Sequence, residues 1–321
     1  MRVPIVCVDT RVRQFALAFA GCFSRPQYRH FVIVLVGLLL CHGPRTLTGL
    51  LRSVQVKTSL ASLSRFLTEA PWKATDLAQT WRKHFDAQLA PWVAQRHADH
   101  RAARPKRRGR PKASIVTGYL IGDDSTCHKQ RGKKMEGIGR HYSTTAGRPV
   151  KGHSLVQSLY VLGGRRCPLA PQLYRQKKVC AAEGVPFRSK IDLMEATIRT
   201  FVALAHTRTH VLLDAWYCAK AIWKAARERG FLITTGLKSN RSIRIADETE
   251  KRGWRWQDLA SYAASLNDAD YQEAVWPRQD GSGRTVWVHV LRTVVQNLYR
   301  AQVIIVREMH DGKLSEARFW A

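Results

Sequence analysis

Two apolar runs in this chain each lead straight into aspartate. Tyr119–Gly122 is followed by Asp123 and Asp124, and Val211–Leu213 is followed by Asp214. Short apolar runs of this kind are typical of buried strands. An unpaired carboxylate beside a core costs several kcal/mol, so it is normally matched by a cation, a metal ion or water. The fold must therefore bring both acidic strand ends to places where their charge is compensated.

The net charge points to a polyanionic partner. The 321 residues include 53 Lys and Arg against 24 Asp and Glu, a formal charge of +29. This excess predicts attraction to nucleic acid or to an anionic membrane. The longest apolar run, Phe31–Cys41, has eleven residues, whereas a membrane-spanning helix needs about 20. We therefore expect a cytoplasmic, nucleoid-associated protein that binds double-stranded DNA and no membrane.

The first part of the chain divides into two segments. Residues 1–95 have helical spacing of apolar residues, and we expect a helical DNA-binding domain there. Two short helices around Val54–Thr58 fit a helix-turn-helix and an ordinary bundle equally well. Residues 96–113 form a basic linker, of which 96–112 hold eight Lys or Arg, one acid and no apolar residue larger than Ala. The linker cannot bury a face and should be disordered when free.

Residues 114–238 predict a mixed α/β core, and residues 239–321 a β-rich region. The expected order in the core is β-β-β-α-β-α-β, which normally gives right-handed crossovers between parallel strands, with loops at their carboxyl ends. Asp123 and Asp214 are expected at such ends. The core elements are strands 119–123, 134–143 and 151–162, a helix capped by Ser189, strand 210–214, helix 217–229 and strand 231–237. In the last region we expect a helix over 254–264 and strands over 284–291 and 300–308.

Two carboxylates brought together at strand ends can bind Mg²⁺ through oxygen. With a third acid they can hold two ions, roughly 3.5–4 Å apart, that stabilise the attacking and leaving oxygens of phosphodiester displacement. Each acid also has an ordinary interpretation, since the Asp123-Asp124 pair could form a turn and Asp214 could cap a helix. The seven cysteines include no Cys-x-x-Cys pair, which argues against structural zinc.

Basic residues outside the core are candidates for DNA contacts. The linker residues Pro105–Lys112 resemble an AT-hook, an extended Arg-Gly-Arg-Pro segment that lies in the narrow minor groove of A·T-rich DNA. A linker that contacts phosphates without sequence preference is the alternative. Lys238 and Arg241 follow a predicted strand and could contact phosphate or belong to a plain basic turn. The linker candidates are Lys106, Arg107, Arg108, Arg110 and Lys112.

Three segments resemble the DDE transposases of bacterial insertion sequences: Asp123–Lys129 with Gly132-Lys133, Leu212–Tyr217, and Gly236–Arg241. The resemblance implies an RNase-H-like catalytic core and a reaction that cuts element ends and joins them to target DNA. It further implies two Mg²⁺ ions, with Mn²⁺ as a substitute, and a homodimer during synapsis. Asp123 would be the first catalytic acid and metal ligand and Asp214 the second. Asp124 is the alternative for the first.

The sequence departs from these transposases at the third acid. They carry a Glu in a helix after the inserted β region, in a stretch resembling Tyr-x-x-Arg-Trp-x-Ile-Glu, which this sequence lacks. The late acids are Glu308, Asp311 and Glu316, in a strand-turn-strand pattern. We expect that the chain stops just before the missing helix, as a truncated transposase. A catalytically inactive DNA-binding protein is the alternative, and a nuclease unrelated to transposition is a third possibility.

Overall fold

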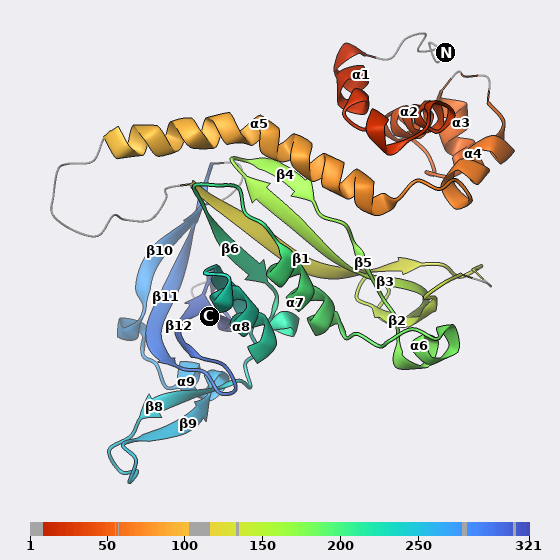
Figure 1. The fold of residues 1–321 in the computed structure, drawn as a ribbon. Coiled ribbons are helices and arrows are strands. Elements are labelled where there is room, and N and C mark those ends of the chain that lie inside the picture. Colours follow the sequence, from red (N-terminus) through yellow and green to blue (C-terminus); the bar gives the residue numbers. More distant parts are fainter. Residues whose placement is uncertain are drawn as a thin grey trace. The chain divides into compact units, whose positions relative to one another are not determined.

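A computed structural model describes residues 9–54, 56, 58–102, 116–132, 135–277, 281–310 and 313–321, with residues 310, 313 and 314 described by their backbone alone. The chain divides into two compact units, residues 1–92 and residues 93–321. Figure 1 shows the helices of the first unit and the sheet of the second. The predicted linker residues 103–113 lie outside the described residues.

The first unit is helical, as predicted. Thr46 and Ser59 cap two of its helices by accepting hydrogen bonds from the backbone N–H groups of Gly49 and Ser62. Its core includes Leu63, which is fully buried, and Phe66, whose ring stacks on Trp72. The helices are α1 (Thr10–Leu17), the 3₁₀ turn η1 (Ala20–Cys22), α2 (Arg25–Leu40), α3 (Leu47–Ser53), α4 (Leu60–Thr68) and α5 (Ala74–Ala102).

Helix α5 is longer than the sequence predicted and crosses the boundary between the two units. Residues 96–102, expected to belong to the disordered linker, are its last turns. Residues 93–102 contain neither Gly nor Pro, and Gln95 donates a hydrogen bond to Asp99 one turn later at 2.7 Å. Local helical preference therefore outweighs the lack of an apolar face there.

The second unit is built on an eleven-stranded sheet (Figure 1) with the order β10-β11-β12-β15-β7-β6-β1-β3-β2. Strands β1, β6 and β7 are parallel, and β3 is antiparallel to β1. The short strands β4 and β5 pair with β3 on the edge that it also shares with β2. The strands are β1 (Val116–His128), β2 (Gly139–Ser143), β3 (Arg148–Leu162), β4 (Arg165–Pro168), β5 (Gln172–Tyr174), β6 (Thr207–Leu213), β7 (Leu232–Leu237), β10 (Gln272–Pro277), β11 (Gly283–Val294), β12 (Arg300–Arg307) and β15 (Arg318–Trp320).

Two helices cover one face of this sheet. Ser189 and Asp192 form the predicted capping box at the start of α7, and Met194 of this helix packs against Gly122 of β1. Helix α8 buries Ile222 and Trp223. The remaining elements are α6 (Lys177–Glu183), α7 (Lys190–Thr200), the 3₁₀ turn η2 (Ala215–Tyr217), α8 (Lys220–Glu228), the hairpin β8 (Ser242–Ala246) and β9 (Trp254–Asp258), α9 (Leu259–Ala264), η3 (Asp268–Asp270), β13 (Met309–His310) and β14 (Lys313–Leu314).

The mixed α/β class and the order of the main core elements agree with the sequence, with two local corrections. The first is the segment 254–264, whose first half is strand β9 and not helix. Its Trp254 ring packs on the guanidinium of Arg244 in the partner strand, 4.1 Å from the ring centroid, and such cross-strand contacts stabilise a hairpin.

The second correction concerns Asp123, which does not lie at the end of its strand. Strand β1 continues to His128 because residues 123–128 remain paired with β3 after the pairing with β6 has ended at Leu213. Asp214 does follow the last residue of β6, as predicted.

None of the helices described in the structure has the length and apolar character needed to cross a membrane.

Candidate active site

The two neighbouring aspartates of β1 point to opposite faces of the sheet, because side chains alternate along a strand. Leu120 and Gly122 face the helices and are buried, and Asp124 continues this row. Asp123 belongs to the other row, with the exposed residues Tyr119 and Ile121. The doublet therefore places one acid under the helices and one on the open face.

Asp124 is held by two side chains from later elements. The Lys190 ammonium, at the first position of α7, lies 2.5 Å from Asp124 Oδ2, and both side chains are about four-fifths buried. The Tyr217 hydroxyl donates to Asp124 Oδ1 at 3.3 Å. Tyr217 is fully buried, and its pKa is raised, first by burial and then by the charge of Asp124. It therefore acts as a neutral donor that fixes one oxygen of the carboxylate.

Asp214 caps the 3₁₀ turn η2 that follows β6. Its Oδ1 accepts hydrogen bonds from the backbone N–H groups of Trp216 at 3.1 Å and Tyr217 at 3.3 Å. Because Tyr217 also donates to Asp124, the same turn contacts both acids. The ordinary capping role considered for Asp214 is thus present, and it holds the carboxylate close to β1.

The three aspartates affect one another electrostatically. The parallel register pairs Gly122 with Leu213, so Asp123 comes next to Asp214. The pKa of Asp214 is raised above the ordinary aspartate value, first by partial burial and also by the charges of Asp123 and Asp124. Asp123 itself accepts a hydrogen bond from the backbone N–H of Asp124 at 2.7 Å. Negative charge at Asp214 is therefore incompletely compensated by the side chains around it.

Oxygen ligands and uncompensated negative charge fit a hard divalent cation. Asp124 and Asp214 are the two acids that share contacts with η2. Within the residues that the structure describes, however, no three His, Cys, Asp or Glu side chains lie close enough together to hold a metal ion. The geometry therefore supports a site with two protein carboxylates.

The late acids considered as third ligands have other surroundings. Glu308 is buried and forms ion pairs with Arg284 and Arg318 at the end of β12. Glu316 is exposed, and Asp311 lies outside the described residues. The pairing of Glu308 explains its burial without a metal ion.

Sequence reasoning missed Lys190 and Tyr217, and it interpreted His141 as a hairpin or surface residue without metal-ligand spacing. His141 is buried, and its pKa is lowered by burial and then by the charge of Lys190, so the imidazole is neutral at pH 7. The available signals were positional: Tyr217 lies three residues after Asp214, and Lys190 opens the helix that Ser189 caps. Neither position reveals a contact with Asp124, because that contact depends on how α7 and η2 pack against β1.

The predicted DNA-binding residues are only partly described. Lys238 lies over the ring of Trp216 in η2, 5.6 Å from its centroid, and both side chains are exposed. The guanidinium of Arg241 donates to the backbone oxygen of Cys218 at 3.0 Å, which gives it a structural role beside the same turn. The linker residues Lys106, Arg107, Arg108, Arg110 and Lys112 lie outside the described residues.

Replacing Asp214 by Asn should raise the melting temperature of the metal-free protein at pH 7, by roughly 1–3 °C. The substitution removes a charge that Asp123 and Asp124 disfavour, and an Asn side chain can still cap η2. Because the pKa of Asp214 is raised on folding, its charged form destabilises the folded protein. This destabilisation is absent at low pH and develops as the pH rises through that pKa. Thermal melts at pH 7 and near pH 3 would measure the difference.

The matched control is Asp258→Asn, at the cap of α9. Asp258 likewise accepts a backbone hydrogen bond, from Ser261 at 2.9 Å, but its pKa is lowered by that bond. We expect this variant not to raise the melting temperature at pH 7. An equal rise in melting temperature in both variants would show that the stabilisation by Asp214→Asn does not come from relief of repulsion among the acids.

An α/β sheet that carries clustered carboxylates beside the carboxyl end of a parallel strand is consistent with an α/β nuclease-like fold. The family model described as "DDE superfamily endonuclease" matches residues 18–256, and the chain belongs to this family. The match covers the helical unit from residue 18, after α1, the core with all three aspartates and most of the β8–β9 hairpin. No curated protein matches the chain.

Proposed function

We propose that the protein is a DDE transposase whose metal-dependent site is built on Asp124 and Asp214. The observation that carries this proposal is the contact of η2 with both acids in a chain of the DDE endonuclease family. The strand order, with β1 between antiparallel β3 and parallel β6, supports an RNase-H-like core. Asp123, the first choice on sequence grounds, is the alternative partner of Asp214.

Each protein group has a role that its position supports. Asp124 and Asp214 would hold Mg²⁺, or Mn²⁺ in its place, through carboxylate oxygens. Bound there, the ion would polarise the scissile phosphate and lower the pKa of a water or 3′-hydroxyl nucleophile. Tyr217 would orient Asp124, and Lys190 would balance its charge. The partner is double-stranded DNA, both at element ends and at the target, and a homodimer would join two ends.

The experiment is an assay of end cleavage and strand joining with purified protein, using Mg²⁺, Mn²⁺ or a chelator. Cleavage together with joining supports a transposase, and cleavage without joining supports a nuclease of another kind. The metal should be required in either case. Cleavage that persists in excess chelator would contradict the proposed site.

A second candidate is a DNA-binding protein without catalytic activity. It is favoured by the observation that the described residues supply two acids and not three to the candidate site. A site that lacks a third carboxylate would hold metal weakly. Tight DNA binding without cleavage in either metal would support it.

The linker should contribute to DNA binding. Replacing Arg108 and Arg110 by Ala is expected to weaken binding and to reduce the slope of log Kobs against log[salt] by up to about 1.8, since each lost phosphate contact removes about 0.9. Fluorescence anisotropy at several salt concentrations measures both changes. Unchanged affinity and slope would rule out a role for the linker.

The matched control is the Arg108→Lys and Arg110→Lys pair, which keeps both charges. With plain phosphate contacts, this variant should bind like the unaltered protein. With an AT-hook, it should lose preference for A·T-rich over G·C-rich duplexes, because a narrow minor groove attracts the guanidinium group. The comparison therefore separates the two interpretations of the linker.

A further inference from the structure

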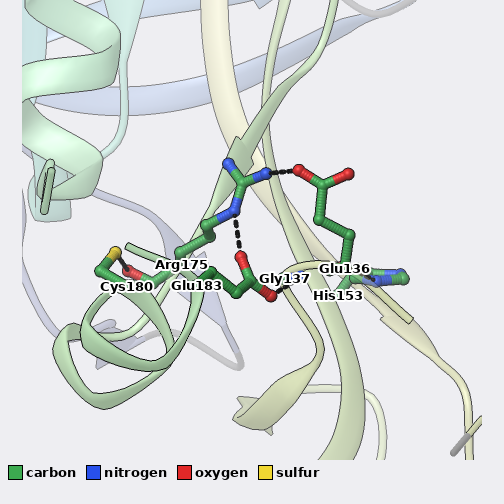
Figure 2. A network of polar contacts seen from close by, with 6 residues as sticks. All are labelled: Glu136, Gly137, His153, Arg175, Cys180 and Glu183. Atoms are coloured by element: carbon green, nitrogen blue, oxygen red, sulfur yellow. Dashed lines mark hydrogen bonds and ion pairs between the residues drawn. The ribbon is translucent and has the colours of Figure 1, made fainter. Parts of the chain in front are cut away.

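The stretch between the two halves of the candidate site is very basic. Residues 125–191 contain fourteen Lys or Arg and only two acids, Glu136 and Glu183. Figure 2 shows that Arg175 lies between these two glutamates and pairs with both. Glu183 also accepts a hydrogen bond from the backbone N–H of Gly137 at 2.6 Å. One arginine therefore engages both acids, and the stretch contains no further carboxylate for its other cations.

Three of these cations form a row across the sheet. Lys151 of β3 is directly opposite Arg140 of β2. On its other side the backbone oxygen of Lys151 accepts a hydrogen bond from the N–H of Lys129 at 2.9 Å. Directly opposite residues of antiparallel strands point to the same face, so the three side chains are neighbours. We call Lys129, Lys151 and Arg140 the cation row.

The cation row has the features of a surface that meets an anion. All three residues are exposed, and among the described residues none of them has a carboxylate within ion-pair distance. Like charges directly opposite one another destabilise a sheet, so the row lowers stability unless something else neutralises it. Tyr142 lies on the same face, two residues along β2 from Arg140, and its side chain is 63% exposed. Lys, Arg and Tyr side chains are all common donors to DNA phosphates.

We propose that the cation row binds the phosphate backbone of double-stranded DNA on the open face of the sheet, the face of Asp123, an inference that rests on the proposed function for its substrate. Lys129 follows Asp124 by five positions along the extended chain, and side chains an odd number of residues apart point to opposite faces. The row therefore lies on the open face of Asp123, and not on the helix-covered face of Asp124. A duplex held by the row runs along this open face of the sheet.

The test is DNA binding by the full chain in excess chelator, so that no cleavage is required. The variant carries Lys129→Ala, Arg140→Ala and Lys151→Ala together. We expect affinity for a duplex of an element end to fall roughly tenfold to a hundredfold near physiological salt, and the salt slope to fall by up to about 2.7. Because repulsion within the row is removed, the melting temperature of the variant should equal or exceed that of the unaltered protein.

A matched control removes the same charge from elsewhere in the unit: Lys224→Ala, Lys251→Ala and Arg252→Ala, all at exposed positions. The control should keep most of the salt slope. Equal losses in both triple variants would overturn the proposal, because total charge would then explain the effect. If the triple variant of the row folds poorly, Lys151→Ala alone, at the centre of the row, replaces it. This single variant should lower the slope by about 0.9, and an unchanged slope would overturn the proposal.

Phosphate-ethylation interference tests the position of the contact. Ethylation of the phosphates that the row contacts should weaken binding of the unaltered protein, and this signal should be lost in the triple variant of the row. A signal that persists in the variant would overturn the proposal. A protein that binds DNA through the row and never cleaves it would instead contradict the proposed transposase function and leave the inference intact.

Discussion

Asp124→Asn and Asp214→Asn are each expected to reduce metal-dependent cleavage at least about a thousandfold, whereas Asp123→Asn should retain most of the activity. Asp124 is the acid of β1 that faces the helices and shares η2 with Asp214. Lys190 lies 2.5 Å from one of its oxygens, so a metal ion bound there would displace or share this contact. An amide at position 124 or 214 would remove an anionic metal ligand but keep the size of the side chain.

Binding of Mn²⁺ gives a second readout that does not depend on turnover. Titration followed by electron paramagnetic resonance should show affinity reduced more than about tenfold in the first two variants, and little changed in Asp123→Asn. Asp123 is exposed on the other face and can still accept the hydrogen bond from Asp124 as an amide. Loss of cleavage and Mn²⁺ binding in Asp123→Asn, with both retained in Asp124→Asn, would restore Asp123 as the first ligand.

Gly152→Ala is expected to lower the free energy of unfolding of the sheet unit by about 3 kcal/mol. A β-carbon at this position would lie 2.1 Å from the backbone carbonyl oxygen of Cys127, in the paired strand. Backbone cannot rotate away as a flexible side chain can, so β1 and β3 must separate. Because Cys127 lies three residues after Asp124, cleavage should fall as well. Urea unfolding followed by circular dichroism measures the change in stability.

A substitution in the adjacent turn controls for the loss of a glycine. Gly147, between β2 and β3, has φ +61°, and a β-carbon there would meet no atom within 4 Å. Asn tolerates this left-handed conformation, so Gly147→Asn should change stability by no more than about 0.5 kcal/mol. A similar loss in both variants would show that the close approach to Cys127 is not the cause.

The parts of the fold that were predictable rest on local patterns. The runs before Asp124 and Asp214 are apolar because they lie inside a sheet, and Ser189 begins a helix because its hydroxyl satisfies a free N–H group. The length of β1 was not predictable in this way, because its second half is held by β3. Strand β9 was mistaken for helix because its stabilising partner, Arg244, lies on another strand.

The sequence predicted which two strands carry the acids of the candidate site. It did not predict how the side chains of those acids are arranged in space. Adjacent residues of a strand face opposite sides, so the doublet contains one inward and one outward acid whatever the register. Which of them is inward depends on where α7 packs, and this is tertiary information. The contacts of Asp124 with Lys190 and Tyr217 join residues far apart in the sequence, so no local spacing reveals them.

The position of β15 has a consequence for folding during synthesis. This strand, Arg318–Trp320, lies between β12 and β7, and in the described sheet it provides the backbone pairing that joins β10–β12 to the parallel strands. A ribosome adds about 5–20 residues per second, so β7 is made several seconds before its neighbour. Until residue 320 is available, both β7 and β12 present open edges that can pair with other chains. The nascent protein therefore passes through a stage that depends on chaperones or on rapid completion to avoid aggregation.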